Sequence, residues 1–135
     1  MSKPEGREEL HDFLAQQHIK DAIEREDLAY VYDKMPSGNR WMLTELLYSL
    51  DVDPLEYVTQ VYSQMFVYHD GNTLVLPKNI EFVDWYAFQL SEITTLRVEN
   101  DNCSFDGQCF SGMNPDCKIY WLGNVYDING RKIRN

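Results

Sequence analysis

The residue types that most often supply a nucleophile, a general base or a metal ligand lie far apart in this chain. All three histidines lie at or before His69, whereas Cys103, Cys109 and Cys117 lie in the last third. Nucleophilic catalysis needs a base within hydrogen-bonding distance of the thiol, and no local pattern links the two sets. The cysteines also lack the C-x-x-C spacing of a zinc site. We therefore expect reduced cysteines that pack in the core as small apolar side chains.

Two other arrangements contain metal-binding residue types without the spacing of a metal site. His11 and His18 are seven residues apart, whereas a histidine pair on a helix usually binds metal at i, i+4 spacing with carboxylate support. The segment NDNCSFDG (residues 100–107) is rich in oxygen atoms, but their order differs from that of a calcium-binding loop. We therefore expect solvent-exposed histidines, a turn at residues 100–107, no metal, no cofactor and no enzymatic activity.

The charge of the chain is strongly negative and unevenly distributed. The 12 Lys and Arg against 22 Asp and Glu give a net charge of −10. Residues 1–70 carry 6 basic and 14 acidic side chains (net −8), and residues 71–135 carry 6 and 8 (net −2). Such a field repels nucleic-acid phosphates and anionic membranes, so we expect neither as a direct partner. The chain starts without an apolar leader and has no run of about 18 apolar residues, which predicts a cytoplasmic protein.

The first half of the sequence has the periodicity of amphipathic helices. Apolar residues recur at helical spacing within residues 7–27, 28–35 and 40–50. Asp53 and Pro54 then form an N-cap signal, which predicts a further helix from Pro54 to about Met65. Two helices joined by a tight turn also occur in DNA-binding helix-turn-helix motifs, but this second helix would present no Lys or Arg. A helical hairpin packed in the core is favoured, with these residues buried: Leu55, Val58, Tyr62 and Met65.

The second half of the sequence repeats itself. Three strand-like segments, TLVL (residues 73–76), TLRV (95–98) and KIYW (118–121), follow one another at offsets of 22 and 23 residues. Between them, Val83, Ala87 and Phe88 recur 22 residues later as Phe105, Cys109 and Phe110. A period of about 20–29 residues with one short strand per period is typical of a leucine-rich-repeat solenoid.

The segment LVLPKNIEFVDWYAF (residues 74–88) resembles the BspA-like leucine-rich repeats, in which a strand is followed by proline, spaced aliphatic residues and an Ala-Phe pair. The resemblance covers about residues 72–121, and the second repeat departs from the pattern at Phe105 and Cys109. The helical lead followed directly by a repeat is also similar to short repeat proteins encoded by bacteriophages. These resemblances imply a scaffold for protein contacts without enzymatic activity.

The sequence predicts an α+β protein in which an N-terminal helical bundle (residues 1–70) caps a short leucine-rich-repeat-like solenoid of parallel strands with a C-terminal β-hairpin (residues 71–135). The hairpin is expected at VYDINGRKI (residues 125–133), with a type I′ turn at Asn129 and Gly130. Two and a half repeats are too few to bury a core alone. We therefore expect one cooperative unit rather than two separable domains.

Two surfaces are candidate binding sites. The first is the concave face of the predicted strands, where Arg97 beside Tyr120 is a pair of the type enriched in interfaces. Its candidate residues are Val75, Thr95, Arg97, Lys118 and Tyr120. The second is the acidic helices, with Glu8, Glu9, Asp12, Asp21, Glu24, Glu26 and Asp27. Ordinary solvated surface would account for either set as well.

Three functional hypotheses follow. The first is a non-enzymatic protein-interaction module, a monomer or weak homo-oligomer, that binds a protein partner. If a bacteriophage encodes it, it would bind or inhibit a host factor or defence protein in the cytoplasm of the host bacterium. The alternative is an acidic mimic of nucleic acid that blocks a DNA- or RNA-binding protein, and its association would weaken steeply with salt. The third is an enzyme of a class without recognisable motifs.

Overall fold

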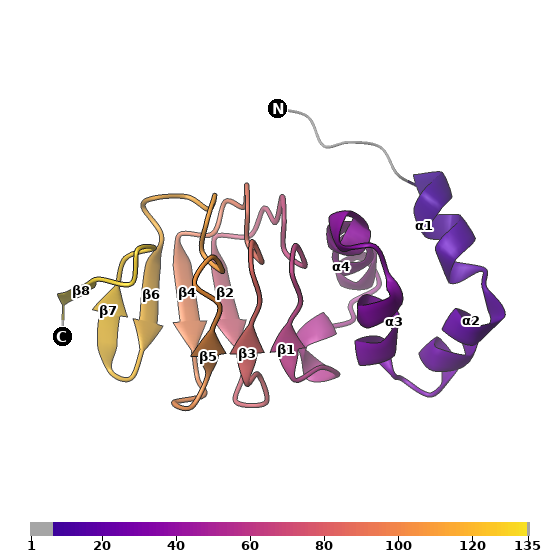
Figure 1. Ribbon diagram of the computed structural model, residues 1–135, viewed down its shortest axis with the longest axis horizontal. Coiled ribbons are helices and arrows are strands. Elements are labelled where there is room, and N and C mark those ends of the chain that lie inside the picture. Colours follow the sequence, from indigo (N-terminus) through magenta and orange to yellow (C-terminus); the bar gives the residue numbers. More distant parts are fainter. Residues whose placement is uncertain (1–6, 135) are drawn as a thin grey trace.

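The computed structural model describes residues 7–134 and places the helices at one end of the molecule, with the strands following one another toward the other end (Figure 1). Among these residues, no helix combines the length and the apolar composition that crossing a membrane requires. The helices are α1 (Arg7–Leu14), α2 (Gln17–Glu24), α3 (Leu28–Lys34), η1 (Ser37–Asn39), α4 (Arg40–Ser49) and η2 (Pro54–Glu56), where η denotes a 3-10 helix. The strands are β1 (Gln60–Val61), β2 (Thr73–Leu76), β3 (Phe82–Val83), β4 (Thr95–Val98), β5 (Ser104–Phe105), β6 (Lys118–Trp121), β7 (Asn124–Tyr126) and β8 (Lys132–Arg134).

The helices before residue 50 follow the amphipathic pattern of the sequence. Ile19 and Ala22 of α2 are fully buried. The Asp27 side chain accepts a hydrogen bond from the backbone N–H of Tyr30 at 3.1 Å and caps α3. Leu50 departs from the pattern because α4 ends one residue before it, and its side chain is exposed.

The predicted helix from Pro54 to about Met65 is wrong. Asp53 does cap a first turn, since its side chain accepts a hydrogen bond from the N–H of Leu55 at 3.0 Å, but only η2 forms and β1 follows it. The β-branched and aromatic residues between 58 and 62 favour an extended backbone, and β1 gains a parallel partner in β3. The helix-turn-helix alternative fails with this helix. The side chains expected on its buried face are nevertheless all buried, namely Leu55, Val58, Tyr62 and Met65.

The strands after the helices form two sheets. One consists of β1, β3 and β5 and is parallel, and the other has the order β2-β4-β6-β7-β8. Strand β4 pairs in parallel with both β2 and β6, with Leu96 opposite Leu74 on one side and opposite Ile119 on the other. The offsets of 22 and 23 residues in the sequence predicted this parallel register correctly.

The predicted fold class, a helical bundle capping a leucine-rich-repeat-like solenoid of parallel strands with a terminal hairpin, is wrong. Residues 7–134 form an α+β structure with four α-helices and two sheets, of which the three-stranded sheet is parallel and the five-stranded sheet is mixed. Strands β7 and β8 pair antiparallel, as the predicted hairpin requires, but they do not seal an end as a separate unit. They extend the larger sheet as antiparallel strands, because the backbone of β6 has a free edge on the side away from β4.

The two-residue turn lies one connection earlier than predicted. Leu122 and Gly123 join β6 to β7 with φ angles of 56° and 74°, and a type I′ turn needs positive values at both central positions. Gly130 also has a positive φ, but Asn129 does not, so the type I′ turn expected at these two residues is wrong. The Asp127 side chain instead accepts a hydrogen bond from the N–H of Asn129 at 2.9 Å and shapes a longer loop.

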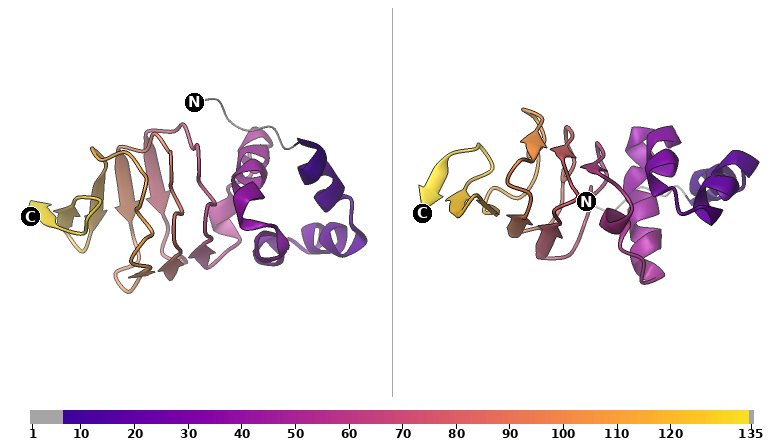
Figure 2. Two further views of the ribbon diagram at one scale, coloured as in Figure 1. Left: turned by 45° about the horizontal axis from the view of Figure 1, so that its top comes forward. Right: turned by 90° about the horizontal axis from the view of Figure 1, so that it is seen from below.

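One apolar core continues from the helices into the sheets, and Figure 2 shows the successive chain segments that enclose it. Phe66, Phe88 and Phe110 form what we call the phenylalanine stack along this core. Neighbouring ring centroids lie 5.9 and 6.1 Å apart, with interplanar angles of 20° and 16°. Successive members of the stack are 22 residues apart. Phe66 therefore extends backward the repeat that relates Phe88 to Phe110.

Arg40 connects α4 to the chain after β1. Its Nε donates to the carbonyl oxygen of Tyr32 at 2.8 Å, and its Nη1 donates to Oγ of Ser63 at 2.6 Å. The guanidinium carbon lies 5.4 Å from the ring centroid of Tyr62. Partial burial lowers the pKa of Arg40, and the nearby charge of Asp33 opposes that shift. The helices are therefore attached to the strands by directional bonds as well as by apolar packing.

Candidate binding surfaces

The outward side chains of β2, β4 and β6 form one continuous surface, which we call the sheet face. Successive residues of a strand point to opposite sides of the sheet. The side chains of Leu74, Leu96 and Ile119 therefore point away from the sheet face, and they are buried. The strand register brings the predicted concave-face residues together. Thr95 lies opposite Lys118, and Arg97 lies between Val75 and Tyr120. The sheet face comprises Thr73, Val75, Thr95, Arg97, Lys118 and Tyr120.

Arg97 and Tyr120 occupy the middle of the sheet face. The guanidinium carbon of Arg97 lies 4.6 Å from the ring centroid of Tyr120, which is a cation–π distance. Val75, opposite Arg97 in β2, is 41% exposed, although an aliphatic side chain gains by burial. On the other side, Val125 of β7 lies opposite Tyr120. Across four neighbouring strands, the cation and the aromatic ring therefore lie side by side between two valines.

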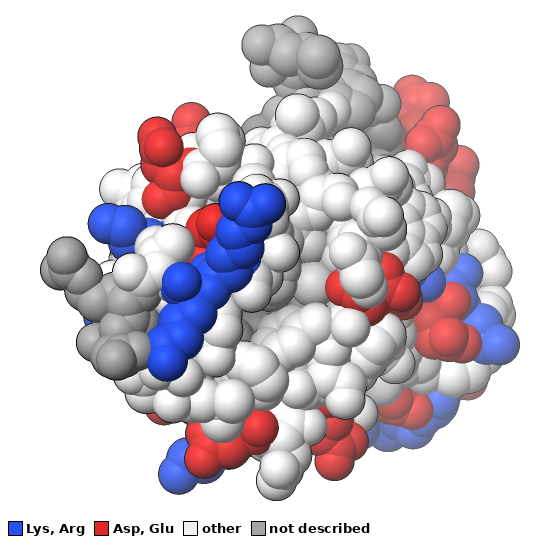
Figure 3. Space-filling view, turned by 60° about the vertical axis from the view of Figure 1, so that its left-hand side comes forward, with Lys and Arg blue, Asp and Glu red and all other residues white. Residues whose placement is uncertain are grey.

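The charge of the sheet face differs from that of the whole protein. Its residues include the exposed cations Arg97 and Lys118, and the exposed Glu99, which follows β4 on the same side, adds one acid. This side of the sheet is therefore weakly positive in a chain of net charge −10. Figure 3 shows a stripe of Lys and Arg on the end of the molecule that carries the last strands. Beside β2 the surface continues into an open cleft of about 410 Å³, lined by Tyr48, Asp51, Val52, Asp53, Leu55, Leu74 and Val75.

The acidic residues predicted as the second surface lie on α1, on α2 and on the turn after α2. Asp27 is the exception to their exposure, because it is half-buried, caps α3 and pairs with Arg25 at 3.4 Å. The others are exposed, namely Glu8, Glu9, Asp12, Asp21, Glu24 and Glu26. The structure therefore leaves six of the seven carboxylates directed to solvent without showing a ligand for them.

The histidines and cysteines do not meet in a catalytic arrangement. His18 Nδ1 lies 2.9 Å from the Tyr30 hydroxyl and its Nε2 lies 2.9 Å from Gln16 Oε1. All three cysteines are buried and free of disulfides, as predicted. Within residues 7–134, no group of three or more His, Cys, Asp or Glu side chains is arranged to hold a metal ion.

The buried thiols are expected to react slowly. Burial raises the pKa of Cys103 and Cys117 to about 11 and that of Cys109 to about 12, from an ordinary value of 9.0. Because the thiolate is the reactive form, the native protein should react with an aromatic disulfide reagent at pH 8 on the order of 100-fold more slowly than the protein in guanidinium. Equal rates in the two conditions would contradict this prediction.

The same shifts set the sign of a pH effect on stability. The unfolded chain releases these protons near pH 9, whereas the folded chain holds them to about pH 11. The unfolded state therefore binds fewer protons in that window, and the free energy of unfolding should fall as the pH rises from about 9 to about 11.

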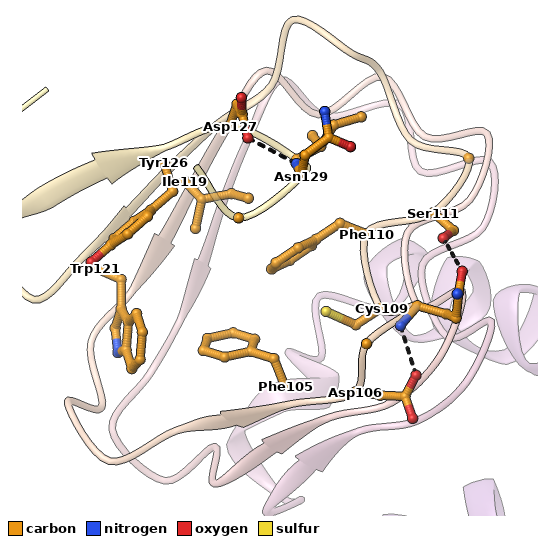
Figure 4. Close-up of a pocket in the computed structure, with 15 residues that line it drawn as sticks. Phe105, Asp106, Cys109, Phe110, Ser111, Ile119, Trp121, Tyr126, Asp127 and Asn129 are labelled. Carbon is orange, nitrogen blue, oxygen red and sulfur yellow. Dashed lines mark hydrogen bonds between the residues drawn. The ribbon is translucent and has the colours of Figure 1, made fainter. Parts of the chain in front are cut away.

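Sequence reasoning missed a pocket of about 700 Å³ at the strand end of the molecule. It lies between the chain after β5 and the loop between β7 and β8 (Figure 4). Its walls include Phe105, Phe110, Trp121 and Tyr126, all of them partly exposed. The sequence signal that could have indicated this pocket is the high density of aromatic residues between 105 and 126. The side of the sheet on which these residues lie depends on the position of the turn at Leu122, which was not predicted.

No protein-family model, no curated protein and no solved structure matches this chain. The likeness to BspA-like repeats and to phage repeat proteins therefore stays a prediction from the sequence, and the function must be argued from the surfaces themselves.

Proposed function

We propose that this protein is a non-enzymatic binding module whose sheet face takes an acidic, partly apolar surface of a partner protein. The observation that carries the proposal is the cation–π pair of Arg97 and Tyr120 at 4.6 Å, placed between the exposed Val75 and the partly exposed Val125. Arg and Tyr are among the residues that dominate binding energy in protein interfaces. A fixed pair loses less conformational entropy on binding than two free side chains would.

Charge complementarity favours an acidic partner surface. Arg97 and Lys118 lie on neighbouring strands of the sheet face, and with the single acid Glu99 after β4 this side of the sheet keeps a net positive charge. Attraction to an acidic surface would orient the partner toward this face, while the acidic helices would repel it. In a bacteriophage setting, the partner would be a host factor or a defence protein of the infected bacterium.

The double variant Arg97→Ala, Tyr120→Ala tests the sheet face. The full-length protein is immobilised and every protein captured from a host lysate is quantified for the wild type and the variant. Proteins bound through the sheet face should be recovered at least about tenfold less with the variant, because truncation of hot-spot residues typically costs about 2 kcal/mol or more. An unchanged thermal midpoint shows that the fold is intact.

The chain offers a matched control. Arg25 and Tyr30 form a second cation–π pair on the helices, with 5.2 Å from the guanidinium carbon to the ring centroid. The double variant Arg25→Ala, Tyr30→Ala removes the same residue types from a different surface and should leave recovery unchanged. If this control loses the captured proteins while the sheet-face variant keeps them, the sheet face is not the binding site.

The acidic mimic is retained as a second candidate because of the six exposed carboxylates on α1, on α2 and after α2. A salt titration of the captured complexes separates the two. Complexes held mainly by charge weaken steeply with ionic strength, whereas an interface centred on Tyr120 and the valines should persist at about 0.5 M salt, where screening removes long-range attraction.

A further inference from the structure

Four aromatic rings surround the pocket at the strand end of the molecule. Phe110 contacts Phe105 with 5.6 Å between ring centroids, Phe105 contacts Trp121 at 5.0 Å, and Trp121 contacts Tyr126 at 6.1 Å. Figure 4 shows the four rings around a central gap, with Phe110 and Tyr126 facing each other across it. We call this arrangement the aromatic box. All four rings belong to the lining of the pocket.

The rings of the aromatic box are held in place from outside the cavity. Trp121 Nε1 donates a hydrogen bond to the carbonyl oxygen of Asn100 at 3.0 Å, and the Tyr126 hydroxyl accepts one from Asn124 Nδ2 at 3.3 Å. Phe110 packs against Phe88 as the last ring of the phenylalanine stack. A ligand would therefore meet walls that are already ordered, which lowers the entropic cost of binding.

The charged residues that line the pocket are all acidic. The lining contains Asp106 and Asp127 and no Lys, Arg or His. Each carboxylate uses its Oδ1 atom locally, since Asp106 accepts from the N–H of Gln108 at 2.8 Å and Asp127 accepts from the N–H of Asn129 at 2.9 Å. In Figure 4 both carboxylates lie outside the four rings and are not directed into the central gap, so their charge acts on a ligand at a distance.

We propose that the aromatic box binds an organic cation with an apolar shell, a methylated ammonium group. The negative faces of aromatic rings attract such a cation, and rings within about 6 Å of it contribute most. The carboxylates of Asp106 and Asp127 add long-range attraction, whereas an anion would be repelled by both. The site is distinct from the sheet face, because Ile119 in the pocket lining and Tyr120 on the sheet face are successive residues and point to opposite sides of β6.

The first test compares a cation with its neutral isostere. Choline and tetramethylammonium are titrated into the full-length protein at constant ionic strength, with 3,3-dimethyl-1-butanol as the uncharged counterpart of choline. Binding is measured by calorimetry and by the fluorescence of Trp121, with a Trp121→Phe variant to subtract other tryptophans. The cations should bind at least about tenfold more tightly than the alcohol. Equal or tighter binding of the alcohol, or no binding of either cation, overturns the proposal.

The second test removes charge without removing the turns. Asp106→Asn, Asp127→Asn keeps both Oδ1 acceptors and should weaken choline binding by about tenfold or more. Asp84→Asn is the matched control, since Asp84 lies 22 residues before Asp106 and outside the pocket lining. Unchanged affinity in the double variant, or equal loss in the control, contradicts the role of the two carboxylates.

The same chemistry can come from a free metabolite or from a methylated lysine of another protein. A peptide with one trimethyllysine is therefore titrated beside choline, with the unmethylated peptide as its control. Tighter binding of the trimethyllysine peptide assigns the site to a protein side chain, and tighter binding of choline assigns it to a small molecule. Both outcomes support the cation site.

Discussion

A fragment that contains only residues 71–135 is expected to remain without a cooperative fold. It lacks β1, so β3 loses one of its two parallel partners and the backbone groups of Phe82 and Val83 face solvent on that side. It also lacks the fully buried Val61, Met65 and Phe66, which belong to the same apolar core as Ile119. Small domains keep only a few kcal/mol of net stability, so a loss of this size removes the folded state.

Side-chain bonds that cross the cut strengthen this expectation. Asn79 Nδ2 donates to the carbonyl oxygens of Leu55 at 2.7 Å and Val58 at 2.8 Å. Within the fragment this amide would have neither acceptor, so two hydrogen bonds that join the strands to the preceding chain would be lost. The contact between the rings of Phe66 and Phe88 would also be lost, which exposes the ring of Phe88.

The measurement is circular dichroism and thermal unfolding of the purified fragment, with the full chain as reference. We expect no cooperative transition and association through the exposed apolar surface. Adding residues 1–70 as a separate chain should restore part of the strand signal. A soluble, monomeric fragment that melts cooperatively would show that the strands form a domain of their own.

Phe88→Ala is expected to lower the free energy of unfolding by about 3–5 kcal/mol, the range for a buried phenylalanine. Phe88 is fully buried and lies between two other rings, so its removal opens a cavity inside the phenylalanine stack. Neither Phe66 nor Phe110 can fill the gap without leaving its own contacts. Because the stack runs along the core, the cavity weakens both sheets together.

Chemical denaturation of the variant and the wild type measures this change. Trp85→Ala is a suitable control, since it removes a larger aromatic ring that lies three residues away and is 37% exposed. It should cost about 1 kcal/mol or less, as expected for a substitution that creates no cavity. A comparable loss in the two variants would contradict the central place given to the phenylalanine stack.

The sequence allowed the strand register to be predicted because short strands repeat apolar residues at a constant offset. Leu74, Leu96 and Ile119 lie opposite one another as that offset indicated. The same reasoning predicted that Arg97 and Tyr120 would be neighbours. Side-chain burial was also predictable where the secondary structure was not: Val58 and Tyr62 are buried whether their segment is a helix or, as found, extended chain.

The remaining errors come from local signals that tertiary pairing overrides. Pro54 after Asp53 starts a helical turn in any context, but the backbone of Gln60 and Val61 gains more from pairing with β3 than from continuing a helix. The turn at Leu122 has a bulky residue at a positive φ, which sequence preferences count against. With that turn misplaced, the antiparallel extension of the sheet and the aromatic box both escaped prediction.

The last strand has a consequence for how copies of the protein behave together. Strand β8 is three residues long and is the outermost strand of the five-stranded sheet, and its pairing with β7 is irregular beside Val125. Exposed Arg131 and Lys132 stand where it begins. Short, irregular and positively charged edges resist the addition of a further strand from another molecule. We therefore expect concentrated solutions not to polymerise into fibres through this edge.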